Sequence, residues 1–114
     1  MKPSVLALGR LPVGAMNRTE AAYAAHLELR RVAGEVAWWL FEGVKLRLAD
    51  KTFYSPDFAV MLSGGELEMH ETKGFMRDDA AVKIKVAAAL FPFRFKLVRA
   101  LPKAKGGGWN IEEY

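Results

Sequence analysis

A glycine-bearing turn near the middle of the chain constrains the fold more than any other feature. Residues 59–62 are apolar, residues 63–65 read Ser-Gly-Gly, and residues 66–70 again mix apolar and polar side chains. This pattern predicts two short antiparallel strands joined by a tight hairpin. A hairpin brings together the two chain ends that lie away from its turn. Asp57, at the start of the first strand, should therefore lie near Glu71 and Lys73 at the end of the second.

The residues at this end of the hairpin predict a metal site. Side chains alternate between the two faces of a strand, so Glu71 and Lys73 should point the same way. Two carboxylates held close together repel each other unless a cation lies between them. Carboxylate oxygens favour Mg²⁺ or Mn²⁺, and the backbone carbonyl of Thr72 would add a third oxygen. We expect Asp57, Glu71 and Thr72 to be the metal ligands.

Such a site suits the cleavage of phosphodiester bonds. A bound divalent cation neutralises phosphate charge and lowers the pKa of a bound water. Lys73 would orient or deprotonate the attacking water, or stabilise the charge that develops on the phosphate. Gly74, which has no side chain, would let a phosphate backbone approach closely.

The remaining pattern predicts an α/β fold around this hairpin. Asn17 and Glu20 form a capping-box pattern at the start of a helix over residues 17–33. Strands are expected at residues 36–41, 44–49 and 93–98, a second helix from residue 78 to 91, and an edge strand at residues 109–111. This order predicts one domain, residues 1–114, with a mixed β-sheet flanked by two helices. An irregular N-terminal arm (1–16) and a basic, glycine-rich tail (102–114) complete it.

Composition narrows the class of protein. The chain has 114 residues, of which 52% are hydrophobic, and it has no cysteine, which excludes disulfides and thiolate metal sites. No apolar run approaches the roughly 20 residues that span a bilayer, and the N-terminus does not resemble a signal peptide, so a cytoplasmic protein is expected. The net charge of +4 suits a polyanionic partner. Basic residues gather after the hairpin: Arg77, Lys83, Lys85, Arg94, Lys96, Arg99, Lys103 and Lys105.

The motif Pro56-Asp57 followed by Glu71-Thr72-Lys73 resembles the signature of the PD-(D/E)xK nuclease superfamily, which has a restriction-endonuclease-like core. Residues 17–109 resemble one small phage and prophage group of uncharacterised endonuclease-like proteins within it. The resemblance is carried by Thr-Glu-Ala-Ala-Tyr at residues 19–23, Tyr-x-Pro-Asp-Phe at 54–58, Glu-x-Lys-Gly at 71–74, and a helix bearing Lys83 and Lys85.

This resemblance implies a Mg²⁺-dependent endonuclease that hydrolyses DNA and acts in phage recombination, repair or replication. Structure-specific cleavage is one option within the superfamily, and the sequence does not choose among the options. It implies catalytic roles for Asp57, Glu71 and Lys73, and adds Glu20, which matches a further glutamate on the first helix of the superfamily. Nucleic-acid contacts are expected from Gly74, Arg77, Lys83 and Lys85. A domain this small covers little duplex, so coordinated cutting of two strands would need a homodimer or a larger partner.

Several alternatives stay open from the sequence. The capping box explains Glu20 without catalysis. The chain could be a non-catalytic nucleic-acid-binding module on the same fold, or an interaction protein that docks a partner through its aromatic strand at residues 36–41. The sequence does not separate DNA from RNA. His26, His70, Trp38 and Trp39 are expected to be structural, and Trp109, beside a basic glycine tract, could be structural or stack on a base.

Overall fold

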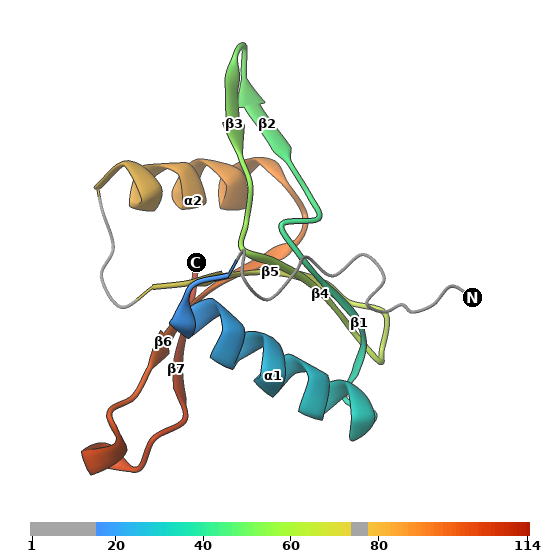
Figure 1. Cartoon of the computed structure of the whole chain (residues 1–114). Helices are drawn as coiled ribbons and strands as arrows, with labels where there is room; N and C mark the ends of the chain where they lie inside the picture. The colour runs from blue at the N-terminus through green and yellow to red at the C-terminus, as the bar shows by residue number, and fades with distance from the viewer. Residues whose placement is uncertain (1–15, 74–77) are drawn as a thin grey trace.

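The computed structural model describes residues 16–73 and 78–114. The elements follow in the order α1 (Arg18–Val32), β1 (Val36–Phe41), β2 (Leu46–Ala49), β3 (Thr52–Tyr54), β4 (Phe58–Leu62), β5 (Leu67–Thr72), α2 (Asp78–Leu90), β6 (Arg94–Ala100), η2 (Lys103–Lys105) and β7 (Trp109–Glu113). The two α-helices lie on opposite sides of a central sheet (Figure 1). The expected α/β class, with a mixed sheet and two flanking helices, is therefore confirmed.

The central sheet has five strands in the order β1-β4-β5-β6-β7. The predicted hairpin is confirmed as β4 and β5, which pair antiparallel with Phe58 opposite His70. Gly65 in its turn has a φ of +96°, a conformation that favours glycine. Among the described strands, β5 and β6 alone pair in parallel, and α2 provides the crossover that a parallel connection needs.

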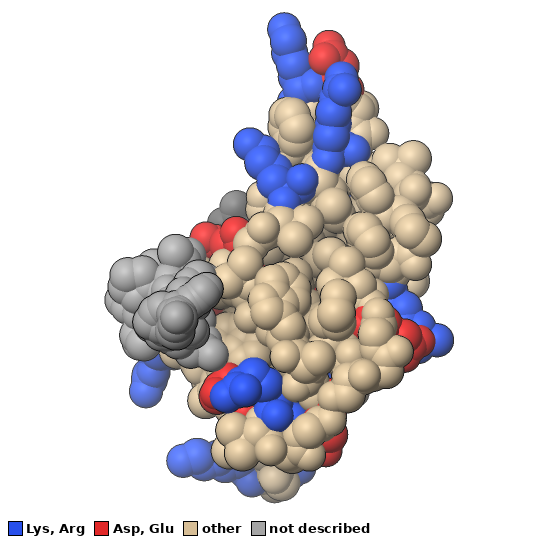
Figure 2. All heavy atoms as spheres, turned by 90° about the vertical axis from the view of Figure 1, so that its right-hand side faces the viewer, with Lys and Arg blue, Asp and Glu red and all other residues tan. Residues whose placement is uncertain are grey.

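The strand predicted at residues 44–49 begins at Leu46 and does not join the central sheet. It pairs instead with β3 in a separate two-stranded sheet. Lys51, in the turn between the two strands, has a φ of 56° and reverses the chain at once. The β2–β3 hairpin stands out from the body of the molecule, and Lys and Arg side chains gather around its tip (Figures 1 and 2).

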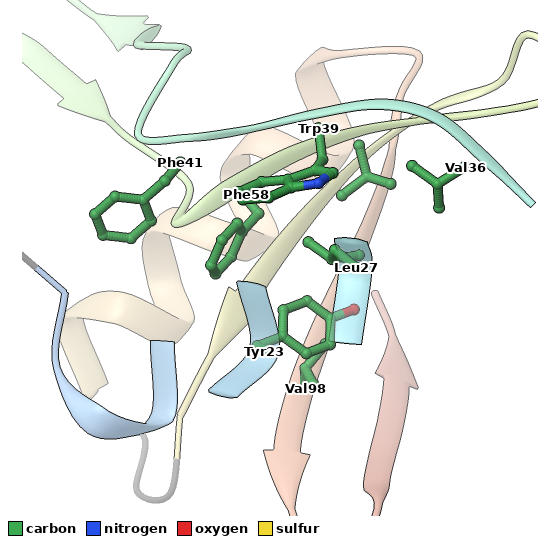
Figure 3. Packing of buried hydrophobic residues seen from close by; sticks show 8 residues of the cluster. Tyr23, Leu27, Val36, Trp39, Phe41, Phe58 and Val98 are labelled. Carbon is green, nitrogen blue, oxygen red and sulfur yellow. The ribbon is translucent and has the colours of Figure 1, made fainter. Parts of the chain in front are cut away.

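The core has one cluster of apolar side chains on each face of the central sheet. On the α1 face, Tyr23 and Leu27 point toward Trp39 and Phe58 (Figure 3). On the α2 face, Ile84 and Ala87 of the helix pack with further buried residues: Leu46, Tyr54, Ala59, Met69 and Phe95. Both helices therefore bury apolar side chains against the sheet.

The helix starts and the C-terminal region also follow the sequence closely. Asn17 caps α1, and both bonds of its capping box with Glu20 are present. The expected edge strand is confirmed as β7, which pairs antiparallel with β6 and extends to Glu113. Residues 103–105 of the expected tail form η2, a short 3₁₀-helix. Within the part of the chain that the structure describes, no helix is long and apolar enough to cross a membrane.

Candidate functional site

Asp57 and Glu71 lie side by side where β4 begins and β5 ends, as the hairpin predicts. Oδ2 of Asp57 accepts hydrogen bonds of 2.9 Å from both the backbone N–H and the hydroxyl of Thr72. The backbone N–H of Asp57 in turn donates to Oε1 of Glu71 at 3.2 Å. Both carboxylates are buried, with exposed fractions of 8% for Asp57 and 6% for Glu71. These bonds fasten the two strand ends and fix the orientation of both carboxylates.

Lys73 completes the group on the side of Glu71. Its Nζ lies 3.6 Å from Oε2 of Glu71, so the two side chains point the same way, as alternation along the strand predicts. The backbone N–H of Lys73 donates to the carbonyl of Val98 on β6, which holds the residue in the sheet. The Lys73 side chain keeps 35% exposure, and its ammonium can therefore reach solvent or a substrate.

Tyr54 is a member of the site that sequence analysis missed. Its buried hydroxyl donates a 2.8 Å hydrogen bond to Oε1 of Glu71. The tyrosine is part of the Tyr-x-Pro-Asp-Phe motif. Its hydrogen bond to Glu71, however, depends on how the β2–β3 hairpin folds back toward the central sheet, which the motif does not show. The available signal was its place three residues before Asp57, which brings it to the same end of β4.

Burial makes two adjacent negative charges costly here. Burial, together with the neighbouring charge of Asp57, raises the pKa of Glu71 to about 7, against the hydrogen bond from Tyr54 and the charge of Lys73. Burial also raises the pKa of Asp57, although the bonds from Thr72 oppose the shift. A divalent cation beside both carboxylates would remove this penalty.

The oxygens that could hold such a cation come from three residues. The hydrogen bonds between the strands use Oδ2 of Asp57 and Oε1 of Glu71, which leaves Oδ1 and Oε2 outside them. The N–H of Thr72 faces Asp57, and in an extended strand the carbonyl of a residue points to the same side as its N–H. This donor set, all oxygen, fits Mg²⁺ or Mn²⁺. Among the described residues, no three His, Asp or Glu side chains are placed to hold a metal together.

Glu20 lies close to this group while it also serves the helix. Its Oε1 accepts a 2.9 Å bond from the backbone N–H of Asn17, and its backbone N–H donates to the Asn17 side chain at 2.8 Å. The capping prediction is therefore confirmed. The negative charge of Glu20 also contributes to the raised pKa of Asp57, so the residue is near the site. Its catalytic role stays a prediction.

The expected nucleic-acid contacts are placed only in part. Gly74 and Arg77 lie outside the described residues. Lys83 is partly buried and Lys85 is exposed, and both lie within α2, on either side of the buried Ile84. Because residues two apart on a helix cannot face the same direction, at most one of these lysines can point toward a given ligand. Their contact with nucleic acid stays a prediction.

The other face of β5 carries a buried polar chain. The Tyr23 hydroxyl lies 2.6 Å from Nδ1 of His70, and Nε2 of His70 lies 2.9 Å from Oε1 of Glu68. Lys96 Nζ is 3.1 Å from the other Glu68 oxygen, and the bonds from His70 and Lys96 lower the pKa of Glu68 to about 2. His70 thus faces away from Glu71 and has a structural role, as expected. Glu68 was missed, although the Glu-x-His spacing already places both residues on one face.

Several of the basic side chains that follow the β4–β5 hairpin in sequence form ion pairs with carboxylates. Arg94 and Arg99 of β6 lie 3.5 Å and 4.0 Å from Glu113 and Glu112 of β7. Lys96 is bound to Glu68. The basic character of the C-terminal half is therefore partly neutralised within the sheet. The attraction of this half for a polyanion stays a prediction.

Comparisons with protein-family models, with characterised proteins and with solved structures found no match for this chain. A function for the chain therefore has to be argued from its motif and from the geometry of this site.

Proposed function

We propose that this protein is a metal-dependent nuclease that hydrolyses phosphodiester bonds of DNA. The observation that carries the proposal is the pair of buried, adjacent carboxylates of Asp57 and Glu71, with the ammonium of Lys73 at 3.6 Å from Glu71. Each carboxylate has one oxygen that the hydrogen bonds between the strands do not use. Two buried carboxylates this close together repel each other, and a bound cation would relieve that repulsion.

The arrangement of the elements supports the same proposal. In the central sheet and its helices, the chain runs through a helix, three strands that lie in the order β1-β4-β5, a second helix, and a strand parallel to β5. This is the order expected for a restriction-endonuclease-like core. The candidate residues lie at one end of its two central strands, β4 and β5, where a phosphate could approach from outside the sheet.

Asp57, Glu71 and the Thr72 carbonyl would hold a Mg²⁺ or Mn²⁺ ion. When bound, this ion would neutralise phosphate charge and lower the pKa of a coordinated water. The chain itself prepares the ligands. Thr72 holds Oδ2 of Asp57, while Tyr54 and the Asp57 N–H hold Oε1 of Glu71, so that little reorganisation is needed on binding.

Lys73 would act on the water or on the phosphate. Its side chain combines contact with Glu71 and access to solvent. From this position the ammonium can donate to a phosphate oxygen and stabilise the charge that develops on it, or the amine can receive a proton from the attacking water. Glu20, which lies near Asp57, would orient the same water through the carboxylate oxygen that the cap leaves unused.

A cleavage assay tests the proposal directly. Plasmid, branched and single-stranded DNA, and RNA of the same sequence, would be incubated with Mg²⁺ or with EDTA. Wild-type protein should cleave DNA only with the metal, and Asp57→Asn and Glu71→Gln should not cleave. Glu66→Gln, which removes an exposed carboxylate from the turn of the same hairpin, is the matched control and should remain active. Cleavage by both site variants at saturating Mg²⁺ would overturn the assignment.

A non-catalytic nucleic-acid-binding module is the second candidate. One observation favours it: both carboxylates already accept hydrogen bonds from the chain, which gives them a structural task without metal. Binding of DNA with no cleavage under any metal condition would support this alternative. If two strands are cut together, a homodimer is expected, and the mass of the complex on DNA would test it.

A further inference from the structure

We propose that the outer face of the β2–β3 hairpin binds an unpaired nucleotide strand, with Lys45 and Arg47 on its phosphates and Phe53 stacked on a base. This surface deepens the proposed function by naming a substrate feature, a single-stranded segment beside the cleavage site. The inference rests on the proposed function only where it connects this surface to cleavage, because binding of the nucleotide strand can be measured without cleavage.

The register of the hairpin places these side chains on one face. Leu46 is opposite Tyr54, and both are buried against the α2 side of the core. The next pair, Arg47 and Phe53, therefore points outward. Phe53 is 40% exposed, and the Arg47 side chain is 65% exposed.

Lys45 belongs to the same outer face. It lies two residues before Arg47, and its Nζ is 4.7 Å from the centroid of the Phe53 ring. An exposed aromatic ring is thus flanked by two cations. Phosphate contacts from cations and stacking of bases on aromatic rings are the two interactions that single-stranded nucleic acid uses on protein surfaces.

The basic side chains of the β2–β3 hairpin are free to bind a polyanion, because within the part of the chain that the structure describes they are unpaired or only weakly paired with carboxylates. Among the described residues Lys45 has no carboxylate partner. Arg47 does lie 3.4 Å from Asp50, but Asp50 is 83% exposed, and ion pairs of this kind contribute little. Lys51 in the turn adds a further positive charge, and Figure 2 shows the basic side chains gathered at this projecting end of the molecule. On β6, Lys96 is held by the buried Glu68, whereas Arg94 and Arg99 form solvent-accessible pairs with β7 that contribute as little as the Arg47 pair.

The hairpin is also tied to the candidate site. β3 ends at Tyr54, whose hydroxyl is bonded to Glu71. Four residues of extended chain span at most roughly 14 Å, so Phe53 lies within that distance of Asp57 along the chain. A strand held on the hairpin would therefore be kept close to the carboxylates.

The test measures binding without metal, so that cleavage plays no part. Fluorescence anisotropy in EDTA would compare a labelled single-stranded oligonucleotide with its duplex. Phe53→Ala should weaken single-strand binding by roughly 5- to 100-fold, whereas Phe53→Trp should keep it. Phe53→Ala should change duplex binding little, because paired bases present no free face. Lys45→Ala and Arg47→Ala should each reduce the slope of log affinity against log salt by about 0.7 on the single strand.

Arg94→Ala is the matched control for Arg47→Ala, because Arg94 is likewise exposed and lies 3.5 Å from a carboxylate; it should bind like wild type. Unchanged single-strand affinity in Phe53→Ala would overturn the inference. So would equally tight, equally salt-dependent binding of polyglutamate, which would show a merely electrostatic surface.

The two proposals fail in different ways. If no DNA is cleaved with Mg²⁺ while the binding pattern holds, the nuclease assignment fails and the hairpin surface stands. If cleavage occurs while all hairpin variants bind like wild type, the hairpin surface fails and the nuclease stands.

Discussion

The Tyr54 hydroxyl donates to the same oxygen of Glu71, Oε1, that also accepts from the Asp57 backbone N–H. One oxygen of the glutamate is thereby committed to the chain, and Oε2 is directed to the side of Lys73. The bond also connects the projecting β2–β3 hairpin to the central sheet. Tyr54 thus sets the orientation of the carboxylate that would hold the metal.

Tyr54→Phe should therefore affect metal affinity more than the fold. The change removes one hydrogen bond to a carboxylate, which costs about 1.5–3 kcal/mol at most, and keeps the ring in the core. Glu71 becomes less firmly oriented, so the Mg²⁺ concentration for half-maximal cleavage should rise several-fold. A metal titration of the cleavage rate measures this. An unchanged titration curve would show that Glu71 needs no help from Tyr54.

Replacements at Asp57 should separate its structural task from its proposed chemical one. Asp57→Ala leaves the N–H and hydroxyl of Thr72 without their acceptor, and a buried unpaired group costs about 1–3 kcal/mol. Asp57→Asn retains an oxygen acceptor and should lose less. Both variants should be inactive. Urea unfolding in EDTA gives the two stabilities, and equal stability of both variants would contradict the structural task.

The raised pKa of Glu71 predicts how stability depends on pH. Since its pKa rises from 4.5 to about 7 on folding, the folded protein binds more protons than the unfolded chain between these values. Stability in EDTA should therefore fall as the pH rises through this window. Mg²⁺ binds the ionised form, so it should raise the melting temperature more near pH 8 than near pH 5.

Glu71→Gln provides the control for this prediction. The amide cannot ionise, so both the pH dependence and the Mg²⁺ effect should be much smaller than in wild type. Calorimetry at both pH values, with Mg²⁺ and with EDTA, measures the four melting temperatures. A wild-type protein that Mg²⁺ stabilises equally at both pH values would count against metal binding by this carboxylate.

Lys73→Ala should lose turnover and still bind Mg²⁺, because the lysine acts on water or phosphate and not on the ion. Lys73→Arg should not restore activity if the amine receives a proton, since a guanidinium does not deprotonate near neutral pH. Single-turnover rates, together with the Mg²⁺-dependent rise in melting temperature, measure the two effects separately. Full activity in Lys73→Arg would exclude the role of Lys73 as a proton acceptor, and only its role in stabilising charge on the phosphate would remain.

The local parts of the fold could be predicted from sequence, because short-range chemistry determines them. The Ser-Gly-Gly turn gave the β4–β5 hairpin, and Asn17 with Glu20 gave the start of α1. The convergence of Asp57, Glu71 and Lys73 then followed from strand alternation and hairpin geometry.

What the sequence could not predict depends on which elements become neighbours. Residues 44–49 alternate as a strand of any sheet would, so nothing local shows that β2 pairs with β3 and leaves the central sheet. Glu68 resembles a solvent-facing strand residue, yet α1 covers that face of β5. Its burial is tolerated because His70 and Lys96 both bind its carboxylate, and Lys96 comes from β6, which is far away in sequence but pairs with β5.

Glu20 offers the sharpest test of the site, because its two roles respond differently to one substitution. Glutamine also serves a capping box, so Glu20→Gln should keep the bond to the Asn17 N–H and the melting temperature of wild type. If Glu20 orients the attacking water, the same variant should cleave at least about 10-fold more slowly, as expected when a charged catalytic group is lost.

Glu20→Ala is the companion variant, because it removes the side-chain bond to the Asn17 N–H as well as the charge. It should lose about 0.5–1 kcal/mol of stability and be as slow as Glu20→Gln. Melting temperature and single-turnover rate would be measured on both variants. If Glu20→Gln cleaves at the wild-type rate and only Glu20→Ala is destabilised, then Glu20 is a cap alone, and the site consists of Asp57, Glu71, Thr72 and Lys73.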